Sequence, residues 1–139
     1  MFKFQTQLTI RSETRYLALL RQWVAATATV VGPRYFPRAA LRAVNLSLIE
    51  AVDNAIFHAH RGHREKPIDV GLRVEAGRVM VVVTDRGRGF RQATTDPPEL
   101  LMTHGRGLLL MRHLMASVEH CRRGKRHMVR MIWKRRVST

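Results

Sequence analysis

A polar line crosses an otherwise apolar stretch of this chain, from Glu50 through Asn54 to His58. Residues four apart lie nearly in line on a helix, so the carboxylate, the carboxamide and the imidazole should look out together from one side. Asparagine is a poor residue for a helix interior, and Ala51 and Phe57 interrupt what would otherwise be an ordinary solvated face. The spacing predicts a polar ligand opposite this face; the alternative is an amphipathic helix with a wet stripe.

A second polar site follows the most hydrophobic strand that the sequence predicts. Asp85 comes directly after the valine-rich run 79–83 and is followed by Gly87 and Gly89. A carboxylate at the buried end of such a strand needs hydrogen-bond partners, and a bound base could supply them. The alternative is a tight turn after a strand, because glycine serves any bend with positive φ.

A second pair of glycines precedes another apolar segment, in Gly105, Arg106, Gly107 and Leu108. Glycines immediately before a helix let backbone N–H groups and the positive helix end approach phosphates, and Arg106 could add a charge-assisted contact. Neither glycine pair completes the dinucleotide-binding pattern G-x-G-x-x-G, and the P-loop pattern is absent from the sequence. We therefore expect a phosphate cradle of a different kind.

Two further features have simpler interpretations than ligand binding. His58, His60 and His63 invite a metal site, but residues two apart point to opposite sides of a helix, so we expect no dedicated metal site there. Residues 122–136 carry many basic side chains and no acid, which could follow a phosphate backbone. No aromatic residues interleave on this charged face as stacking platforms, so we interpret it as the solvated side of an edge strand.

The elements that must position these residues can be predicted from periodicity and turn residues. The expected strands are 2–10, a hairpin of 68–74 and 79–83 turning at 76–77, and two strands at the end of the chain, of which 125–134 is the clearer. The expected helices run from an N-cap at Ser12 to near Gly32, from Pro37 to near Gly62, and from Leu108 to Val118.

Composition limits the domain organisation and the class of partner. The 139 residues, 45% of them hydrophobic, suit a single domain spanning 1–139, and no window approaches the ~20 apolar residues of a membrane span. The net charge of +15 predicts attraction to a polyanion: nucleic acid, nucleotide phosphates, anionic lipid or an acidic protein. Cys121 is the one cysteine, so an intrachain disulfide and a cysteine-based zinc site are excluded, and we expect a cytoplasmic protein.

The three motifs in this order, E-x-x-x-N on a helix, D-x-G-x-G after a hairpin and G-x-G-L opening a helix, resemble the Bergerat ATP-binding fold of gyrase, histidine kinases and MutL. The short domain is most similar to the anti-sigma factor serine kinases of bacteria, and the resemblance covers nearly the whole chain. It implies an α/β (α+β) fold: a two-layer sandwich whose mixed, mostly antiparallel sheet is covered by helices.

The resemblance also implies a role for each motif residue. Glu50 corresponds to the general base, Asn54 to the magnesium ligand and Asp85 to the acceptor of the adenine amine. The other residues of the implied nucleotide site are His58, Gly87, Gly89, Gly105, Arg106, Gly107 and Leu108, with 91–104 as the nucleotide lid. Family members often carry Gly-Thr near the penultimate strand, whereas this chain reads G-K-R-H-M-V at 124–129, so the resemblance assigns no adenine contact there.

The implied function is that of an Mg²⁺-ATP-dependent serine/threonine protein kinase. Its implied partners are an anti-anti-sigma (STAS-type) protein, which it phosphorylates, and a sigma factor or similar regulator, which it sequesters; a homodimer is allowed. Two alternatives stay open: a non-catalytic ATP-binding scaffold for protein partners, and a nucleic-acid binder driven by the basic tail. Specific nucleic-acid binding and membrane insertion are not expected.

Overall fold

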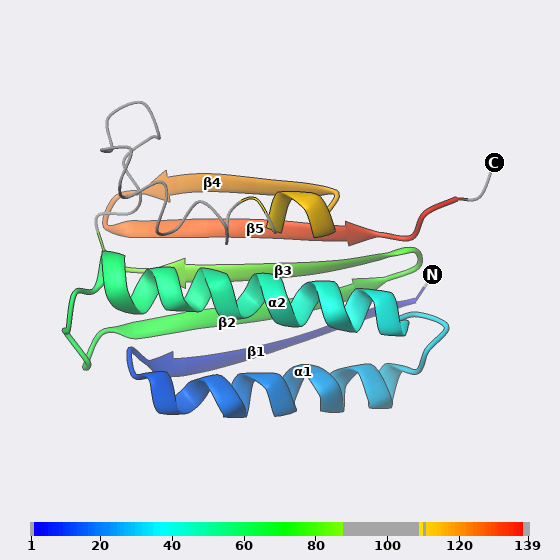
Figure 1. The fold of residues 1–139 in the computed structure, drawn as a ribbon, viewed down its shortest axis with the longest axis horizontal. Coiled ribbons are helices and arrows are strands. Elements are labelled where there is room, and N and C mark those ends of the chain that lie inside the picture. Colours follow the sequence, from blue (N-terminus) through cyan, green and yellow to red (C-terminus); the bar gives the residue numbers. More distant parts are fainter. Residues whose placement is uncertain (1, 88–108, 110, 138–139) are drawn as a thin grey trace.

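Five strands form one sheet, and two helices lie side by side over one of its faces (Figure 1). The computed structural model describes residues 2–87, 109 and 111–137. The strands are β1 (Lys3–Arg11), β2 (Pro67–Glu75), β3 (Arg78–Asp85), β4 (Ser117–Arg123) and β5 (Arg126–Lys134). The helices are α1 (Leu17–Val31) and α2 (Arg38–Asn54), with a 3₁₀ turn before α1 (Thr14–Tyr16) and a π-helical turn after α2 (Ala55–Ala59).

The sheet has the order β1-β2-β3-β5-β4, and this confirms the expected two-layer α/β sandwich. Each of the four pairings between these strands is antiparallel, so the mixed sheet that we expected has no parallel pair among the described strands. The last two strands form a hairpin whose second strand, β5, pairs with β3 and leaves β4 at the sheet edge. The end of β3 therefore faces β5.

Strict alternation in the central hairpin builds the core. The even-numbered residues of β2 from Ile68 to Val74 are buried, as are Val79, Val81 and Val83 on β3, while their neighbours point to the open face of the sheet. From the other layer, α1 contributes Leu20 and Val24, and α2 contributes Val44, Leu48 and Val52. Burying each such side chain stabilises the fold by about 1.5–3 kcal/mol, which fixes α2 firmly on the sheet.

The predicted ends of the first two helices agree closely with the structure. Gly32 has φ of 86° and its N–H bonds to the Ala28 carbonyl, so α1 ends at the left-handed glycine that the sequence indicated. Pro37 is the N-cap of α2 rather than its first residue. Gly62, also at φ 86°, closes the turn after the second helix.

Two predicted boundaries are wrong. Ser12 is not a helix N-cap; its hydroxyl instead donates to the Lys66 carbonyl. The helix expected to reach Val118 ends earlier, because Ser117 and Val118 pair with β5 in β4. The described helical residues there are 109 and 111–114, and the expected helix start at Leu108 and the lid 91–104 lie outside the described residues.

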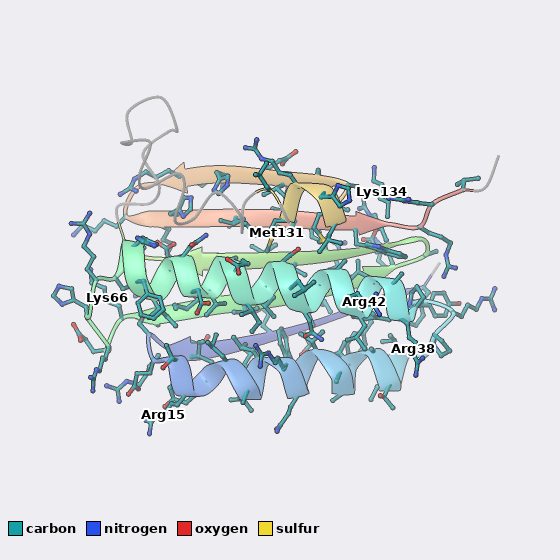
Figure 2. All side chains as sticks on the ribbon, viewed as in Figure 1. Arg15, Arg38, Arg42, Lys66, Met131 and Lys134 are labelled. Atoms are coloured by element: carbon teal, nitrogen blue, oxygen red, sulfur yellow. The ribbon has the colours of Figure 1, made fainter. Side chains whose placement is uncertain are left out.

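Positive charge is spread over the molecule rather than confined to the basic tail. Figure 2 labels Arg15 and Lys66 toward one end of the helical layer and Arg38 and Arg42 toward the other, with Lys134 at the end of β5. No described helix is long and apolar enough to cross a membrane.

Candidate functional site

A small pocket lies where the end of α2, the π turn and strands β3, β4 and β5 meet. Its volume is about 20 Å³, room for about one water molecule. Its polar lining residues are Asn54, His58, Asp85, His120 and His127. Hollows of about 500 and 690 Å³ lie on the open face of the sheet and beside the start of α2, but the predicted site residues do not line them. Of these three cavities, only the small pocket is lined by predicted site residues.

The structure brings three predicted site residues to this pocket and places two others nearby. Asn54, His58 and Asp85 line it, although they come from α2, the π turn and β3. Glu50 lies on α2 one turn before Asn54; it is half-buried, and its carboxylate has no hydrogen bond or ion pair with another described residue. Gly87 lies just beyond Asp85. The remaining predicted residues, Gly89, Gly105, Arg106, Gly107 and Leu108, lie outside the described residues.

The sequence pattern predicts a regular α-helix through His58, but the structure shows a different geometry there. After Asn54 it widens into a π turn, closed by the bond from the His60 N–H to the Ala55 carbonyl at 2.9 Å. A π turn inside an α-helix is rare and is frequently found at functional sites. Here it keeps His58 on the pocket while it brings Ala59 against the turn after β3.

Gly87 is required by a close contact rather than by its backbone angle. A Cβ added there would lie 2.5 Å from the Cβ of Ala59, closer than real Cβ atoms approach one another. Gly87 is not among the glycines with positive φ, so the left-handed bend suggested by sequence is not the reason for this glycine. The glycine lets the turn after β3 pack directly on the π turn.

Asp85 is buried, with 4% of its surface exposed, and both its carboxylate oxygens are engaged. Oδ1 accepts the Gly87 N–H at 2.9 Å, and Oδ2 lies 3.1 Å from Nδ1 of His127. A buried carboxylate held by two donors keeps two further acceptor positions, because each oxygen has two lone pairs. Asp85 can therefore still accept a hydrogen bond from a ligand.

The sequence prediction missed His127 and its neighbour His120. His127 faces Asp85 directly across the β3–β5 ladder and is 6% exposed, and its Nε2 lies 3.2 Å from Nδ1 of His120 on β4. Partial burial of its ring, followed by the neighbouring His127 and Arg112, lowers the pKa of His120. One signal was available: His127 has the same alternation phase as the core residues Val129 and Met131.

His60 does not line the pocket, but it holds the turn that follows β3. It is fully buried; its Nε2 accepts the Arg86 N–H at 3.0 Å, and its Nδ1 lies 2.5 Å from the Ser12 hydroxyl. Since Nε2 accepts, Nδ1 carries the proton and donates to Ser12. Burial is the main reason that the pKa of His60 is lowered. With both ring nitrogens engaged, His60 is a support for the turn after β3.

Comparison with known proteins identifies the family. Residues 10–133 match the model of the histidine kinase-like ATPase domain, which is most of the chain. The chain belongs to this family. This confirms the family that the three motifs indicated.

One curated relative is the serine-protein kinase RsbW of Oceanobacillus iheyensis, 24% identical over 123 residues, which are 81% of this chain and 76% of the relative. Among solved structures, the RsbU and RsbW domains of Rv1364c from Mycobacterium tuberculosis match with a TM-score of 0.70 and 15% identity. That match covers 98% of this chain but 34% of the longer one, and it supports the fold alone.

The residues at the pocket fit the ligands that a histidine kinase-like ATPase domain implies. Asp85 retains acceptor positions for the exocyclic amine of adenine, and the Asn54 carboxamide is a neutral oxygen ligand of the kind that Mg²⁺ accepts. Among the described residues, no group of three or more His, Cys, Asp or Glu side chains could hold a metal ion. Mg²⁺ would therefore be held by Asn54 together with phosphate oxygens and water, as is usual for this ion.

Proposed function

We propose that this protein binds Mg²⁺-ATP at the pocket and transfers the γ-phosphoryl group to a serine or threonine of an anti-anti-sigma (STAS-type) protein, while it sequesters a sigma factor or similar regulator. One observation carries this proposal: Asn54 and Asp85, from different elements, line one pocket one helical turn beyond Glu50. Membership of the histidine kinase-like ATPase domain family and the likeness to RsbW support it.

Asp85, Asn54 and Glu50 have different roles, which follow from their chemical types. Asp85 accepts the base amine, Asn54 contributes an oxygen to Mg²⁺, and Glu50 accepts the proton of the attacking hydroxyl. The hydroxyl oxygen bonds to the γ-phosphorus, the bond to the β–γ bridging oxygen breaks, and ADP leaves. Such a transfer depends mostly on positioning and charge neutralisation, with the base contributing at the acceptor. The Glu50 carboxylate, which is not paired with another described residue, suits that role.

The partner assignment rests on relatives and on charge. RsbW is named a serine-protein kinase, and a chain with a net charge of +15 suits an acidic protein surface. The partner would reach the pocket from the side of Glu50, because the acceptor hydroxyl must meet both that carboxylate and the γ-phosphate.

A second function is favoured by the closed state of the pocket. A volume of about 20 Å³ does not admit a base until lining side chains move, so nucleotide binding must change the shape of this region. If the protein has no phosphotransfer activity, this change alone could control a protein interface. The nucleic-acid reading is weaker, because the positive charge is distributed over both ends of the helical layer (Figure 2).

Transfer of labelled phosphate from ATP separates the two functions. The wild-type protein is incubated with Mg²⁺-ATP and each STAS-type protein encoded near its gene, and calorimetry measures nucleotide binding in parallel. We expect both binding and transfer. Binding without transfer to any such protein would favour the scaffold, and absence of both, with the protein folded, would refute the ATP site.

A further inference from the structure

Two imidazoles connect the buried carboxylate of the pocket with the edge of the sheet. Asp85 Oδ2 lies 3.1 Å from His127 Nδ1, and His127 Nε2 lies 3.2 Å from His120 Nδ1. The two rings are nearly parallel, with their centroids 5.3 Å apart and an interplanar angle of 17°. The three groups come from β3, β5 and β4, so they form a relay across neighbouring strands.

When both imidazoles are neutral, each hydrogen bond of the relay has one donor and one acceptor. With Asp85 ionised, His127 donates from Nδ1 to the carboxylate and accepts at Nε2 from the Nδ1–H of His120. One added proton can also be accommodated, because His127 can then donate from Nε2 if His120 accepts at Nδ1. A second added proton would place two N–H groups against each other and break the contact. The lowered pKa of His120 agrees with a limit of one.

The hydrogen bond from His127 gives Asp85 more than a partner for a buried carboxylate. The Gly87 N–H already satisfies Oδ1, but one bond leaves the carboxylate plane free to turn about that oxygen. The second bond, from His127, fixes the plane and hence the direction of the remaining lone pairs. His127 also forms part of the pocket wall, as does His120. A ligand that bonds to Asp85 must therefore meet a carboxylate whose orientation is set by His127.

We propose that His127, held by His120, is a positioning residue that orients the Asp85 carboxylate toward the exocyclic amine of adenine and so sets the preference of this pocket for adenine over guanine nucleotides. This inference rests on the proposed function. Adenine presents an amine where guanine presents a carbonyl, and a carboxylate fixed in place bonds to the first and repels the second. A carboxylate free to turn loses that discrimination.

The test measures binding of Mg²⁺-ADP and Mg²⁺-GDP by calorimetry. His127→Leu fills a similar volume but removes the donor. ADP affinity should fall about tenfold or more, since a buried charged acceptor loses its partner, while GDP affinity should not fall. His127→Asn should restore ADP affinity to within about threefold of wild type, because its Nδ2 lies as many bonds from Cα as His127 Nδ1. His63→Gln, an exposed histidine outside the pocket, is the matched control.

A second variant separates orientation from simple packing. His120→Phe keeps a ring on the exposed edge strand and removes the Nδ1–H that holds His127, so the ratio of ADP affinity to GDP affinity should fall with little effect on folding. This variant tests the proposal if His127→Leu does not fold.

The possible results are distinguishable. Equal losses in His127→Leu and His127→Asn, unchanged ADP affinity in His127→Leu, or an unchanged ratio of ADP affinity to GDP affinity in His120→Phe would each overturn the relay while the ATP site stands. If the folded wild type binds neither nucleotide, the proposed function and this inference fail together.

Discussion

Gly87 packs so closely on Ala59 that a Cβ on the glycine would come within 2.5 Å of the alanine Cβ. The turn that follows Asp85 and the π turn that follows Asn54 thus touch backbone to backbone. The spacing of the two polar residues that meet at the pocket depends on this contact. Disrupting this contact should lower both the free energy of unfolding and the affinity for nucleotide.

Gly87→Ala should destabilise the protein by about 1–3 kcal/mol, the usual cost of inserting a methyl group into a packed site. Denaturant unfolding measures the effect. Gly71→Ala is the matched control, because Gly71 has nothing within 4 Å of an added Cβ and no positive φ, so it should be neutral or slightly stabilising. Equal stabilities of the two variants would contradict the contact.

Glu50→Gln should separate chemistry from binding. Its amide keeps the shape of the side chain but cannot take a proton, so phosphotransfer should fall by about 100-fold or more while ATP affinity changes little. Labelled transfer to the partner and calorimetric titration give the two values. Glu65→Gln, at an exposed acid outside the pocket, should leave both unchanged. Undiminished transfer by Glu50→Gln would exclude this residue as the base.

Asn54→Ala should weaken ATP binding about tenfold when Mg²⁺ is present, since a metal ligand with a charge-assisted contact is lost. In the presence of a chelator, the variant and the wild type should bind ATP with similar affinity. Calorimetry under both conditions gives the comparison. A loss of the same size without Mg²⁺ would show that Asn54 contacts the nucleotide directly.

The buried His60 should make the fold sensitive to acid. Burial lowers its pKa below the ordinary value of 6.5; the influence of Asp85 opposes this, while Lys66 and His63 add to it. In the unfolded chain the ring gains its proton first, so the stabilisation is fully present above about pH 6.5 and is lost as the pH falls through the folded pKa. The lowered pKa of His120 acts in the same direction.

Melting temperature measured across pH checks this expectation. The wild type should lose stability below about pH 6.5, and His60→Gln, although less stable at neutral pH by about 1–3 kcal/mol, should show a shallower decline. His113→Gln, at an exposed histidine that does not act on His60, serves as the control with the wild-type slope. Parallel curves for wild type and His60→Gln would show that His60 does not carry the acid sensitivity.

Affinity for DNA should be weak, independent of sequence and steeply reduced by salt, because it would come from counterion release alone. Fluorescence anisotropy with two unrelated duplexes over a range of salt concentrations measures it. Tight binding to one duplex at physiological salt would instead favour the nucleic-acid alternative.

The features that depend on residues nearby in the sequence could be predicted from sequence patterns. The alternation of Ile68–Val74, the turn at Gly77 and the end of α1 at Gly32 depend on residues near them in sequence, and each was found where expected. The burial of His127 depends on the β3–β5 register, a non-local pairing that no nearby residue specifies. Ser117 and Val118 likewise joined β4 because β5 was there to pair with them.

The residues of the polar pocket also differ in how far the sequence could predict them. Asn54 and Asp85 could be matched by motif, whereas His60 was considered only as a possible metal ligand, and its complete burial was not predicted. What decides its position is the π turn, which moves His60 relative to a regular helix and brings it within reach of Ser12 and the Arg86 N–H. A turn of this kind has no reliable signature in the residues that form it.

The π turn also bears on how this chain should be compared with its relatives. Its closing bond spans five residues, from His60 back to Ala55, where an α-helical turn would span four, so the helix holds one residue more than a regular helix over the same path. An alignment that forbids gaps inside the motif helix would shift every residue after Asn54 by one position in a relative without this turn. Relatives should therefore be aligned with a one-residue insertion permitted between Asn54 and His60, next to the exposed Phe57.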